Sequence, residues 1–412
     1  MTLPCASAAP AGIDFDAAVR QAARLPGLAG PGALLFATGK IDAAKRFYET
    51  LLSANPESRE AHAGLYYAYG ALGDKHRAAS HLGLATQWPA VLTLPFRGRG
   101  AAVPVLLLLS MNAGNVLIQR FLNDRIFQTY VVIVEFYSSS VVLPAHRLII
   151  NGIGDADVRS QALTAAGQIL AQSSAPVVNA PARVLATSRC GNAQRLGGIP
   201  GVVTPRTAAF PRRQLESADA PEELARRGFE FPLLVRAPGY HMGKNFVRVD
   251  SPGDLATAVA AFPGDKLIAI QYLDGRGPDG KIRKYRVLTI GGKLYPVHLA
   301  IASQWKIHYF SADMADHPEH RAEEAGFLAN MEAVLGPKVM AGLAWIQDAL
   351  GLDYAGVDFG LNAQGDVLLY EANATMAVVR PDADPRWDYR RSAVERIYAA
   401  VQDLFVSRAL AA

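Results

Sequence analysis

The spacing of hydrophobic and polar positions divides the chain into a helical first part and a longer part in which strands and helices mix. Residues 14–88 carry apolar side chains at helical spacing, and a shift of 34 residues places Gly39 on Gly73 and Ala44 on Ala78. Small residues at fixed positions let two antiparallel helices approach closely, with the glycine in the turn between them. The pattern therefore predicts α-helical hairpins over residues 14–90.

The shift of 34 residues resembles the period of the tetratricopeptide repeat (TPR), of which this region would hold roughly one and a half to two units. Pro56 closes the first unit, and Pro89 lies one residue from the matching position. Each repeat needs a neighbour to cover its apolar face, so we expect this region to pack on the next domain or on a partner. Two interpretations stay open, a module for protein partners or self-association and a plain helical cap on the rest of the chain.

After a connector at residues 90–102, which is punctuated by proline and glycine, strand patterns alternate with helix patterns. Such alternation is typical of a parallel sheet with helices on both faces, which predicts an α/β domain over residues 100–205. The strands expected here are 103–109, 130–136, 147–151 and 176–179, and the helices are 116–122 and 158–173.

From about residue 205 the strands follow one another more closely, as in an antiparallel sheet. Gly291 and Gly292 form a tight hairpin turn, and residues 362–365 form another. The strands expected are 233–236, 246–249, 267–272, 286–290, 293–299, 355–361 and 366–371, and the helices are 321–335, 337–350 and 388–407. These elements predict an α+β body over residues 206–412.

Composition and charge narrow the setting of the protein. Its 412 residues carry 41 basic and 37 acidic side chains, and a net charge of +4 is too small to indicate a nucleic-acid partner. Two cysteines exclude a disulfide framework and favour a reducing compartment. The strongest apolar run, at 103–109, is too short to cross a membrane, and the first ten residues lack the pattern of a signal peptide. We therefore expect a cytoplasmic protein without a membrane partner.

Acidic and amide side chains in the last expected hairpin suggest a metal site. Asp358 lies in one strand and Glu371 in the next, where the two can sit opposite each other. Asn373, two residues further on, faces the same side as Glu371. Two carboxylates and an amide oxygen form the hard, all-oxygen site that Mg²⁺ takes together with phosphate oxygens. The alternative is an ordinary hairpin whose acidic residues have other partners.

Basic residues around a glycine-containing loop suggest a phosphate site. Arg236 ends one strand, and Lys244 precedes the next, after a loop in which Gly239 and Gly243 let backbone N–H groups approach phosphates. The later strand 267–272 ends at residues able to bond an adenine edge through the backbone, and Asp274 is placed to meet a ribose hydroxyl. The residues assigned to adenosine are Gln271, Tyr272, Leu273 and Asp274.

Taken in order, these segments resemble the ATP-grasp superfamily of carboxylate–amine ligases, over roughly residues 103–405. The most specific parts are Asp358 with Glu371-x-Asn373 and the strand–loop–strand around 236–249. Lys284-Tyr285-Arg286 before the Gly291-Gly292 hairpin and the lead-in segment 198–205 also match. The resemblance implies a pre-ATP-grasp α/β domain at 100–205, an ATP lobe at about 206–275 and a metal-binding lobe at about 276–412. The sequence around Asp358 and Glu371 looks like that of proteins that fuse TPR repeats to an ATP-grasp module.

The resemblance also implies an activity, in which Mg-ATP (or Mn-ATP) activates a carboxylate as an acyl phosphate and an amine then displaces phosphate. Arg286 would stabilise the transferring phosphoryl group, while Arg236 and Lys244 would bind the nucleotide phosphates. The family's first ATP-contacting cation is normally lysine, so Arg236 is a departure that alters the geometry of phosphate binding. The implied substrates are a small-molecule or peptide carboxylate and an amine, and a homo-oligomer is expected. The acceptor-site candidates are His298, Trp305, Lys306 and His308.

Two other functions stay open at this point. The repeats and the Arg236 departure also suit a nucleotide-binding TPR adaptor that holds a partner protein without ligase turnover. An ATP-grasp kinase would stop at phosphoryl transfer and release a phosphorylated product without needing an amine.

Overall fold

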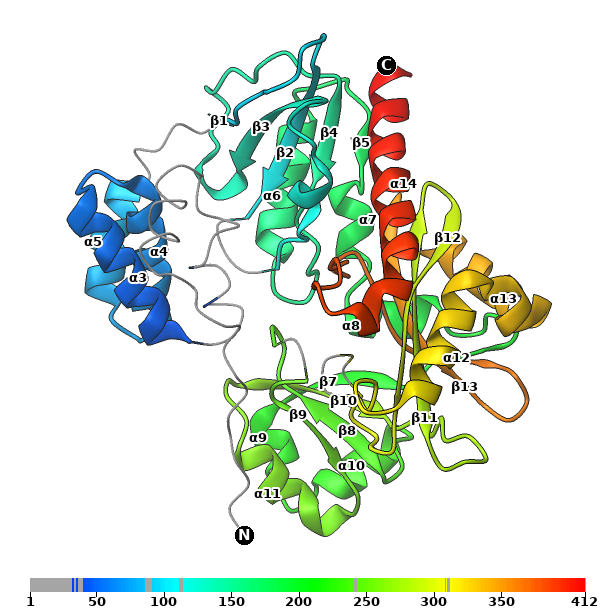
Figure 1. Cartoon of the computed structure of the whole chain (residues 1–412). Helices are drawn as coiled ribbons and strands as arrows, with labels where there is room; N and C mark the ends of the chain where they lie inside the picture. The colour runs from blue at the N-terminus through cyan, green and yellow to red at the C-terminus, as the bar shows by residue number, and fades with distance from the viewer. Residues whose placement is uncertain are drawn as a thin grey trace. The chain divides into compact units, whose positions relative to one another are not determined.

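The computed structural model describes residues 32, 35, 40–85, 91–110, 114–240, 243–307, 309 and 312–411 (Figure 1). The chain forms two compact units. One holds residues 1–93, 110–113 and 131–143, and the other holds residues 94–109, 114–130 and 144–412. The three-part division expected from the sequence stays a prediction.

The first unit contains the helices α3 (Ile41–Ala54), α4 (Arg59–Ala71) and α5 (Lys75–Ala85), followed by β1 (Val91–Thr93). Phe47 and Leu65 belong to the core that these helices enclose. A side chain at Gly64 would collide with the ring of Tyr48, so this glycine lets α3 and α4 approach closely. Gly73 has φ +82° in the turn before α5, as expected of a glycine in that place. The TPR identity stays a prediction, and most of its first expected unit lies outside the described residues.

The second unit begins with a sheet whose central strands are parallel. β3 (Phe127–Ile133, whose last three residues belong to the first unit), β2 (Val103–Leu109), β4 (Leu148–Asn151) and β5 (Val177–Val178) lie in that order. β4 pairs in parallel with both β2 and β5, which confirms the expected parallel sheet. The helices that follow its strands are α6 (Ser160–Leu170), α7 (Pro181–Leu185) and α8 (Arg189–Arg195).

Two elements of this region differ from the prediction. The expected helix at 116–122 is only the short 3₁₀ helix η1 (Ile118–Phe121). Asn123 ends it, because its side chain accepts a hydrogen bond from the backbone of Arg125 and turns the chain. The expected strand at 130–136 begins earlier, as β3, and gives way after Ile133 to the 3₁₀ turn η2 (Val134–Phe136).

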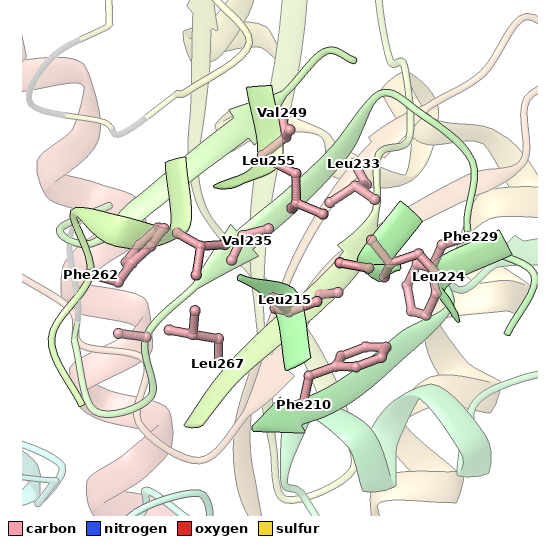
Figure 2. Close-up of a cluster of buried hydrophobic side chains, with 14 residues drawn as sticks. Phe210, Leu215, Leu224, Phe229, Leu233, Val235, Val249, Leu255, Phe262 and Leu267 are labelled. Carbon is pink, nitrogen blue, oxygen red and sulfur yellow. The ribbon is translucent and has the colours of Figure 1, made fainter. Parts of the chain in front are cut away.

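A second sheet is antiparallel, with the order β7 (Thr207–Pro211), β10 (Lys266–Gln271), β8 (Leu233–Arg236), β9 (Phe246–Val249). One face packs on the helices α9 (Arg212–Leu215), α10 (Ala220–Arg226) and α11 (Leu255–Ala260), and the turn η3 (Pro252–Asp254) contacts α11. Figure 2 shows the resulting core, in which Leu233 and Val235 of β8 meet Leu224 and Leu255 from the helices. Because side chains alternate along a strand, Leu234 and Arg236 lie on the opposite face of the sheet.

A third sheet has the order β12 (Lys293–Ala302), β11 (Ile282–Ile290), β13 (Tyr354–Leu361), β14 (Val367–Asn373), β6 (Val202–Val203). Its first four strands pair antiparallel, as expected, while β6 joins β14 in parallel. The helices α12 (Pro318–Ala329) and α13 (Met331–Leu350) follow β12. α12 and α13 divide at Asn330, whose side chain caps α13 by accepting a hydrogen bond from the Ala333 backbone. The predicted break between residues 335 and 337 is also present, because Gly336 inside α13 has non-helical dihedral angles (φ +73°) and is followed by Pro337.

The last helix, α14 (Arg391–Leu410), follows the 3₁₀ turn η5 (Pro385–Arg390) and packs on the first sheet of its unit (Figure 1). The Phe405 ring meets Phe127 of β3 edge to face at 6.2 Å. The Tyr398 ring lies 4.7 Å from that of Phe121 in η1. Residues far apart in sequence therefore complete one core.

No described helix combines the length and the apolar character that crossing a membrane requires.

Candidate active site

A row of four polar side chains crosses the third sheet, one from each of four adjacent strands. His298 on β12 pairs with Arg286 on β11, Arg286 pairs with Asp358 on β13, and Asp358 pairs with Glu371 on β14. Directly opposite residues of antiparallel strands present their side chains on the same face. The row lines a cavity of about 850 Å³ within the second unit.

Asp358, which is 3% exposed, is the most strongly held member of the row. Arg286 donates to both of its carboxylate oxygens, from Nε at 2.6 Å and Nη2 at 2.8 Å, and Lys284 Nζ lies 3.1 Å from Oδ2. Burial opposes ionisation of this carboxyl, but the two cations outweigh it and hold the pKa of Asp358 well below its usual range. Asp358 is therefore a carboxylate at any pH near neutrality.

Glu371 is held by a different arginine. Arg189, at the start of α8, donates from Nη2 to Glu371 Oε1 at 2.5 Å and from Nη1 to Asp157 Oδ2 at 2.6 Å. Burial alone would raise the pKa of Glu371, but Arg189 and Arg236 lower it overall. Arg189 was not among the residues expected from the sequence. It stands 182 positions from Glu371, and only the packing of α8 on the third sheet brings the two together.

The donor set of Asp358, Glu371 and Asn373 fits a hard divalent cation, because all three side chains offer oxygen and two of them are ionised. Asn373 follows Glu371 by two residues on β14 and lines the same cavity. Its Oδ1 accepts hydrogen bonds from the Thr375 backbone at 2.9 Å and the Thr375 hydroxyl at 2.8 Å. Neighbouring donors engage all three side chains, so a bound cation would share their oxygens with these donors or replace them.

A second group with metal-binding side chains lies away from the cavity. The ligand atoms of His317, Glu319 and His320 lie within 4.8 Å of one another. Both ring nitrogens of His320 are engaged, Nδ1 with the Asp313 carbonyl at 2.9 Å and Nε2 with Lys281 Nζ at 2.7 Å. Since a metal ion would have to displace Lys281, we assign none here.

Arg236 projects from β8 into the cavity and lacks a full set of partners. Its Nη2 donates to the Tyr240 carbonyl at 2.5 Å, its Nε is buried without a hydrogen-bond partner in the described residues, and the Phe246 ring lies 5.5 Å away. Burial, with some repulsion from Arg189, lowers the pKa of Arg236 to about 10. A desolvated cation at a cavity wall favours an anionic ligand.

Among residues 237–240 and 243–245, which are the described part of the loop after β8, only Gly243 lines the cavity. Gly239 and Gly243 have φ of +78° and +70°, values that favour glycine. A Cβ on Gly243 would lie 2.6 Å from Lys306 Cε, so the loop also approaches the end of β12 closely. Lys244 is not a lining residue, and its ammonium group lies 5.7 Å from the Tyr240 ring.

The segment between the second and third sheets places three of the four adenosine candidates at the cavity, namely Gln271, Tyr272 and Leu273. The side chain of Gln271 is bound elsewhere, since it accepts from the Glu230 backbone and donates to the carbonyls of Glu230 and Pro232. Asp274 does not line the cavity, and its Oδ1 lies 3.7 Å from Arg276 Nε.

The acceptor-site candidates lie at the β12 end of the row. His298, Trp305 and Lys306 line the cavity, and His308 lies outside the described residues. Lys306 donates to the Phe246 carbonyl at 2.9 Å, and Trp305 packs edge to face on the Phe246 ring. His298 is buried, and burial together with Arg286 and Arg390 places its pKa well below the usual value, so its ring is neutral.

Three further residues at this end were not expected from the sequence, namely Tyr309, Trp387 and Arg390. The Tyr309 ring stacks on His298 at 4.7 Å, and the guanidinium carbon of Arg390 lies 4.1 Å from the centre of the same ring. Trp387 and Arg390 belong to η5, far from β12 in sequence. Their aromatic and basic character was a visible signal, but nothing in the local pattern links η5 to β12.

The sequence matches no protein-family model and no curated protein. Among solved structures, the chain is similar to the VanG D-Ala:D-Ser ligase from Enterococcus faecalis, with a TM-score of 0.46 and 14% identity over 75% of this chain and 100% of the other. It is also similar to a RimK domain ATP-grasp protein from Sphaerobacter thermophilus, with a TM-score of 0.45 and 15% identity over 74% and 99%. A D-alanine–D-alanine ligase from Bacillus anthracis, complexed with ATP, gives 0.45 and 11% over 75% and 97%. Because these TM-scores are below 0.5, the likeness alone assigns no activity to this chain.

Proposed function

We propose that this protein is an ATP-dependent ligase of the ATP-grasp type that joins a carboxylate to an amine through an acyl phosphate. The observation that carries the proposal is the row His298–Arg286–Asp358–Glu371 along one wall of a large cavity. The row combines ligands for a divalent cation with a half-buried arginine, and Arg236 adds a desolvated cation on a second sheet. This combination suits the binding and transfer of phosphoryl groups.

The side chains of this chain would divide the work by charge. Asp358, Glu371 and Asn373 would hold Mg²⁺, which when bound supplies charge neutralisation for the phosphate oxygens of ATP. Arg236 would bind phosphate oxygens of the nucleotide, with the glycine loop and Lys244 beside it. Gln271, Tyr272 and Leu273 would contact adenosine through backbone atoms, because the Gln271 side chain is already hydrogen-bonded.

The proposed reaction has two steps. An oxygen of the substrate carboxylate attacks the γ-phosphorus of ATP, the bond to the β-phosphate oxygen breaks, and ADP leaves with that electron pair. The amine nitrogen then attacks the acyl carbon and displaces inorganic phosphate, and the amine gives up a proton as the amide forms. Arg286 would stabilise the negative charge on the transferring phosphoryl group through its positive charge and its remaining N–H donors, because Nε and Nη2 are already bound to Asp358.

The neutral ring of His298 gives it a role in the second step. A histidine held neutral by burial can accept a proton without first losing one. His298 neighbours Arg286 across the strand pair, so it stands beside the group proposed to hold the acyl phosphate. We infer that it receives the proton of the attacking amine.

An ADP-release assay with paired carboxylates and amines, followed by mass detection of the product, tests the proposal. We expect ADP and phosphate to appear only when both substrates are present. Glu371→Gln should lower the rate about 100-fold or more, because it removes a charged ligand at the reacting phosphates. The matched control is Glu216→Gln, an exposed residue paired with Arg212 on α9, which should leave the rate unchanged.

Other outcomes would point to the alternatives. ADP release that needs a carboxylate but no amine, with a stable phosphorylated product, would indicate a kinase. Tight binding of Mg-ATP with no release of ADP in any substrate pair would contradict the ligase and favour the nucleotide-binding adaptor.

A further inference from the structure

Arg390 is a buried cation with unusually few partners. Its side chain is 10% exposed, and its Nε is buried without a hydrogen bond to any described residue. Its charged contacts in the described structure are a 3.3 Å approach of Nε to Glu324 Oε1 and the face of the Tyr309 ring. A guanidinium carries five N–H donors, so most of its hydrogen-bonding capacity is unused.

Glu324 does not satisfy the N–H donors of Arg390, because other donors already bind the Glu324 carboxylate. It is fully buried on α12 and accepts from the Tyr389 hydroxyl at 2.5 Å and the Tyr309 hydroxyl at 3.2 Å. The Leu299 backbone N–H approaches Oε1 at 3.4 Å. Glu324 therefore anchors the segment that carries Arg390 and balances its charge, while the donors of the guanidinium stay available to a ligand.

A second unsatisfied polar atom lies at the same end of the cavity. His298 Nε2 is buried and has no hydrogen-bond partner within the described part of the chain. The His298 ring and the Arg390 guanidinium both pack on Tyr309, at 4.7 Å and 4.1 Å, and all three residues line the cavity. Buried polar groups in native proteins are normally satisfied, so two orphans beside one ring indicate a ligand group that is polar and anionic.

We propose that Arg390 binds a non-reacting carboxylate of the substrate, so that the amine substrate is an amino acid with a free carboxylate. The inference rests on the proposed ligase function, and it names the substrate class of the same cavity. A carboxylate matches the planar fork of a guanidinium with two parallel hydrogen bonds. The rings of Tyr309 and Trp387, whose centres are 6.3 Å apart, line the cavity beside Arg390. Arg390 is thus a specificity-determining residue.

The test compares each proteinogenic L-amino acid with its carboxamide, which differs only in the charge that Arg390 would read. Binding to the full-length protein is measured by calorimetry in the presence of Mg-ADP, without requiring turnover. For at least one amino acid we expect the parent protein to bind the acid at least about ten times more tightly than the carboxamide. Arg390→Gln should reduce that ratio to about one.

Two further variants separate recognition from folding. Arg386→Gln removes an exposed arginine of the same 3₁₀ turn, paired with Asp384 at 2.6 Å, and should keep the parent ratio. Arg390→Gln combined with Glu324→Gln removes both charges of the buried pair, so it should fold even where the single variant does not, and its ratio should again be about one.

The contrary results either overturn the carboxylate site at Arg390 or separate it from the ligase function. Equal affinity of acid and carboxamide in the parent, an unchanged preference in the folded double variant, or no binding of any amino acid would exclude a carboxylate site at Arg390. A preference lost in Arg390→Gln without any ADP release would keep the carboxylate site and contradict the ligase. ADP release with an amine that lacks a carboxylate, at the same kcat/KM, would keep the ligase and contradict this inference.

Discussion

Asp358 and Glu371 lie directly opposite each other on β13 and β14, and each carboxylate is bound by a different arginine. Arg286 reaches Asp358 from the neighbouring strand, while Arg189 reaches Glu371 from α8. Two adjacent carboxylates repel each other, which would favour protonation of one of them. Because both keep lowered pKa values, the pair stays doubly ionised and prepared for a divalent cation.

Asp358→Asn should destabilise the protein strongly, because it leaves Arg286 and Lys284 without their shared anion. The loss of one partner of a buried ion pair costs roughly 3–5 kcal/mol of unfolding free energy. Urea denaturation followed by circular dichroism measures the change, and Asp358→Asn with Arg286→Met should recover part of it. Asp366→Asn, whose partner Lys338 is exposed, should change the unfolding free energy very little, because solvent screens such a surface pair. Equal costs for Asp358→Asn and Asp366→Asn would contradict the role of the pair.

Arg236→Lys tests what the departure from lysine contributes. Lysine keeps the positive charge but loses the fork and the hydrogen bond to the Tyr240 carbonyl. We expect the KM for ATP to rise by about threefold to tenfold with a smaller change in kcat, and Arg236→Gln to cost about 100-fold in kcat/KM. Arg226→Lys, an exposed position on α10, is the matched control. A kcat/KM for ATP that Arg236→Gln leaves unchanged would remove this residue from the nucleotide site.

His298→Asn should change the pH dependence of stability in a defined direction. The folded protein holds His298 neutral with a pKa well below 6.5, whereas the unfolded chain takes up a proton near pH 6.5. The parent should therefore lose stability as the pH falls below about 6.5, by roughly 1.4 kcal/mol per pH unit for this group. Melting curves between neutral and mildly acidic pH measure it, and the variant should lack this component. Parallel curves would show that the ring is not held neutral.

Gly356→Ala should destabilise the third sheet where β13 faces Asn373. A Cβ at this position would overlap the side chain of Met376, which is buried against it. Overpacking of this kind typically costs about 1–3 kcal/mol. The matched control is Gly326→Ala in α12, where a Cβ has open space and should stabilise the helix by about 0.5–1 kcal/mol. Thermal unfolding of both variants checks the opposite signs.

Local patterns in the sequence predicted most of the second unit. The bounds of β2, β8 and β9 coincide with the expected strands, because each strand is a short apolar or alternating run with a clear change of pattern at its ends. The opposition of Asp358 and Glu371 followed from the hairpin and the two-residue period of a strand. The predicted break between residues 335 and 337 is present at Gly336, whereas the further boundary at Asn330 depends on a side-chain cap that the apolar pattern does not show.

The remaining site residues could not be predicted because tertiary packing places them. Arg189 sits in a polar stretch whose ordinary interpretation is a solvated helix start, and its carboxylate partner stands far along the chain. The position and burial of Arg390 depend on its contacts with Glu324 and Tyr309, which lie elsewhere in the sequence. Gln271 is the opposite example. The sequence suggests that its side chain is available to a ligand, but the structure shows that side chain hydrogen-bonded to the backbone of Glu230.

The packing of α14 on the first sheet sets the order in which the second unit matures during synthesis. Phe127 and Phe405, whose rings are in contact, are 278 positions apart in the sequence (405 minus 127). The contact between Phe121 and Tyr398 likewise joins an early segment to α14. The strands of the second and third sheets are therefore synthesised before α14 can cover the first sheet. Until then the apolar β2 and β4 lack that cover, and exposed apolar strands of this kind favour aggregation of the nascent chain.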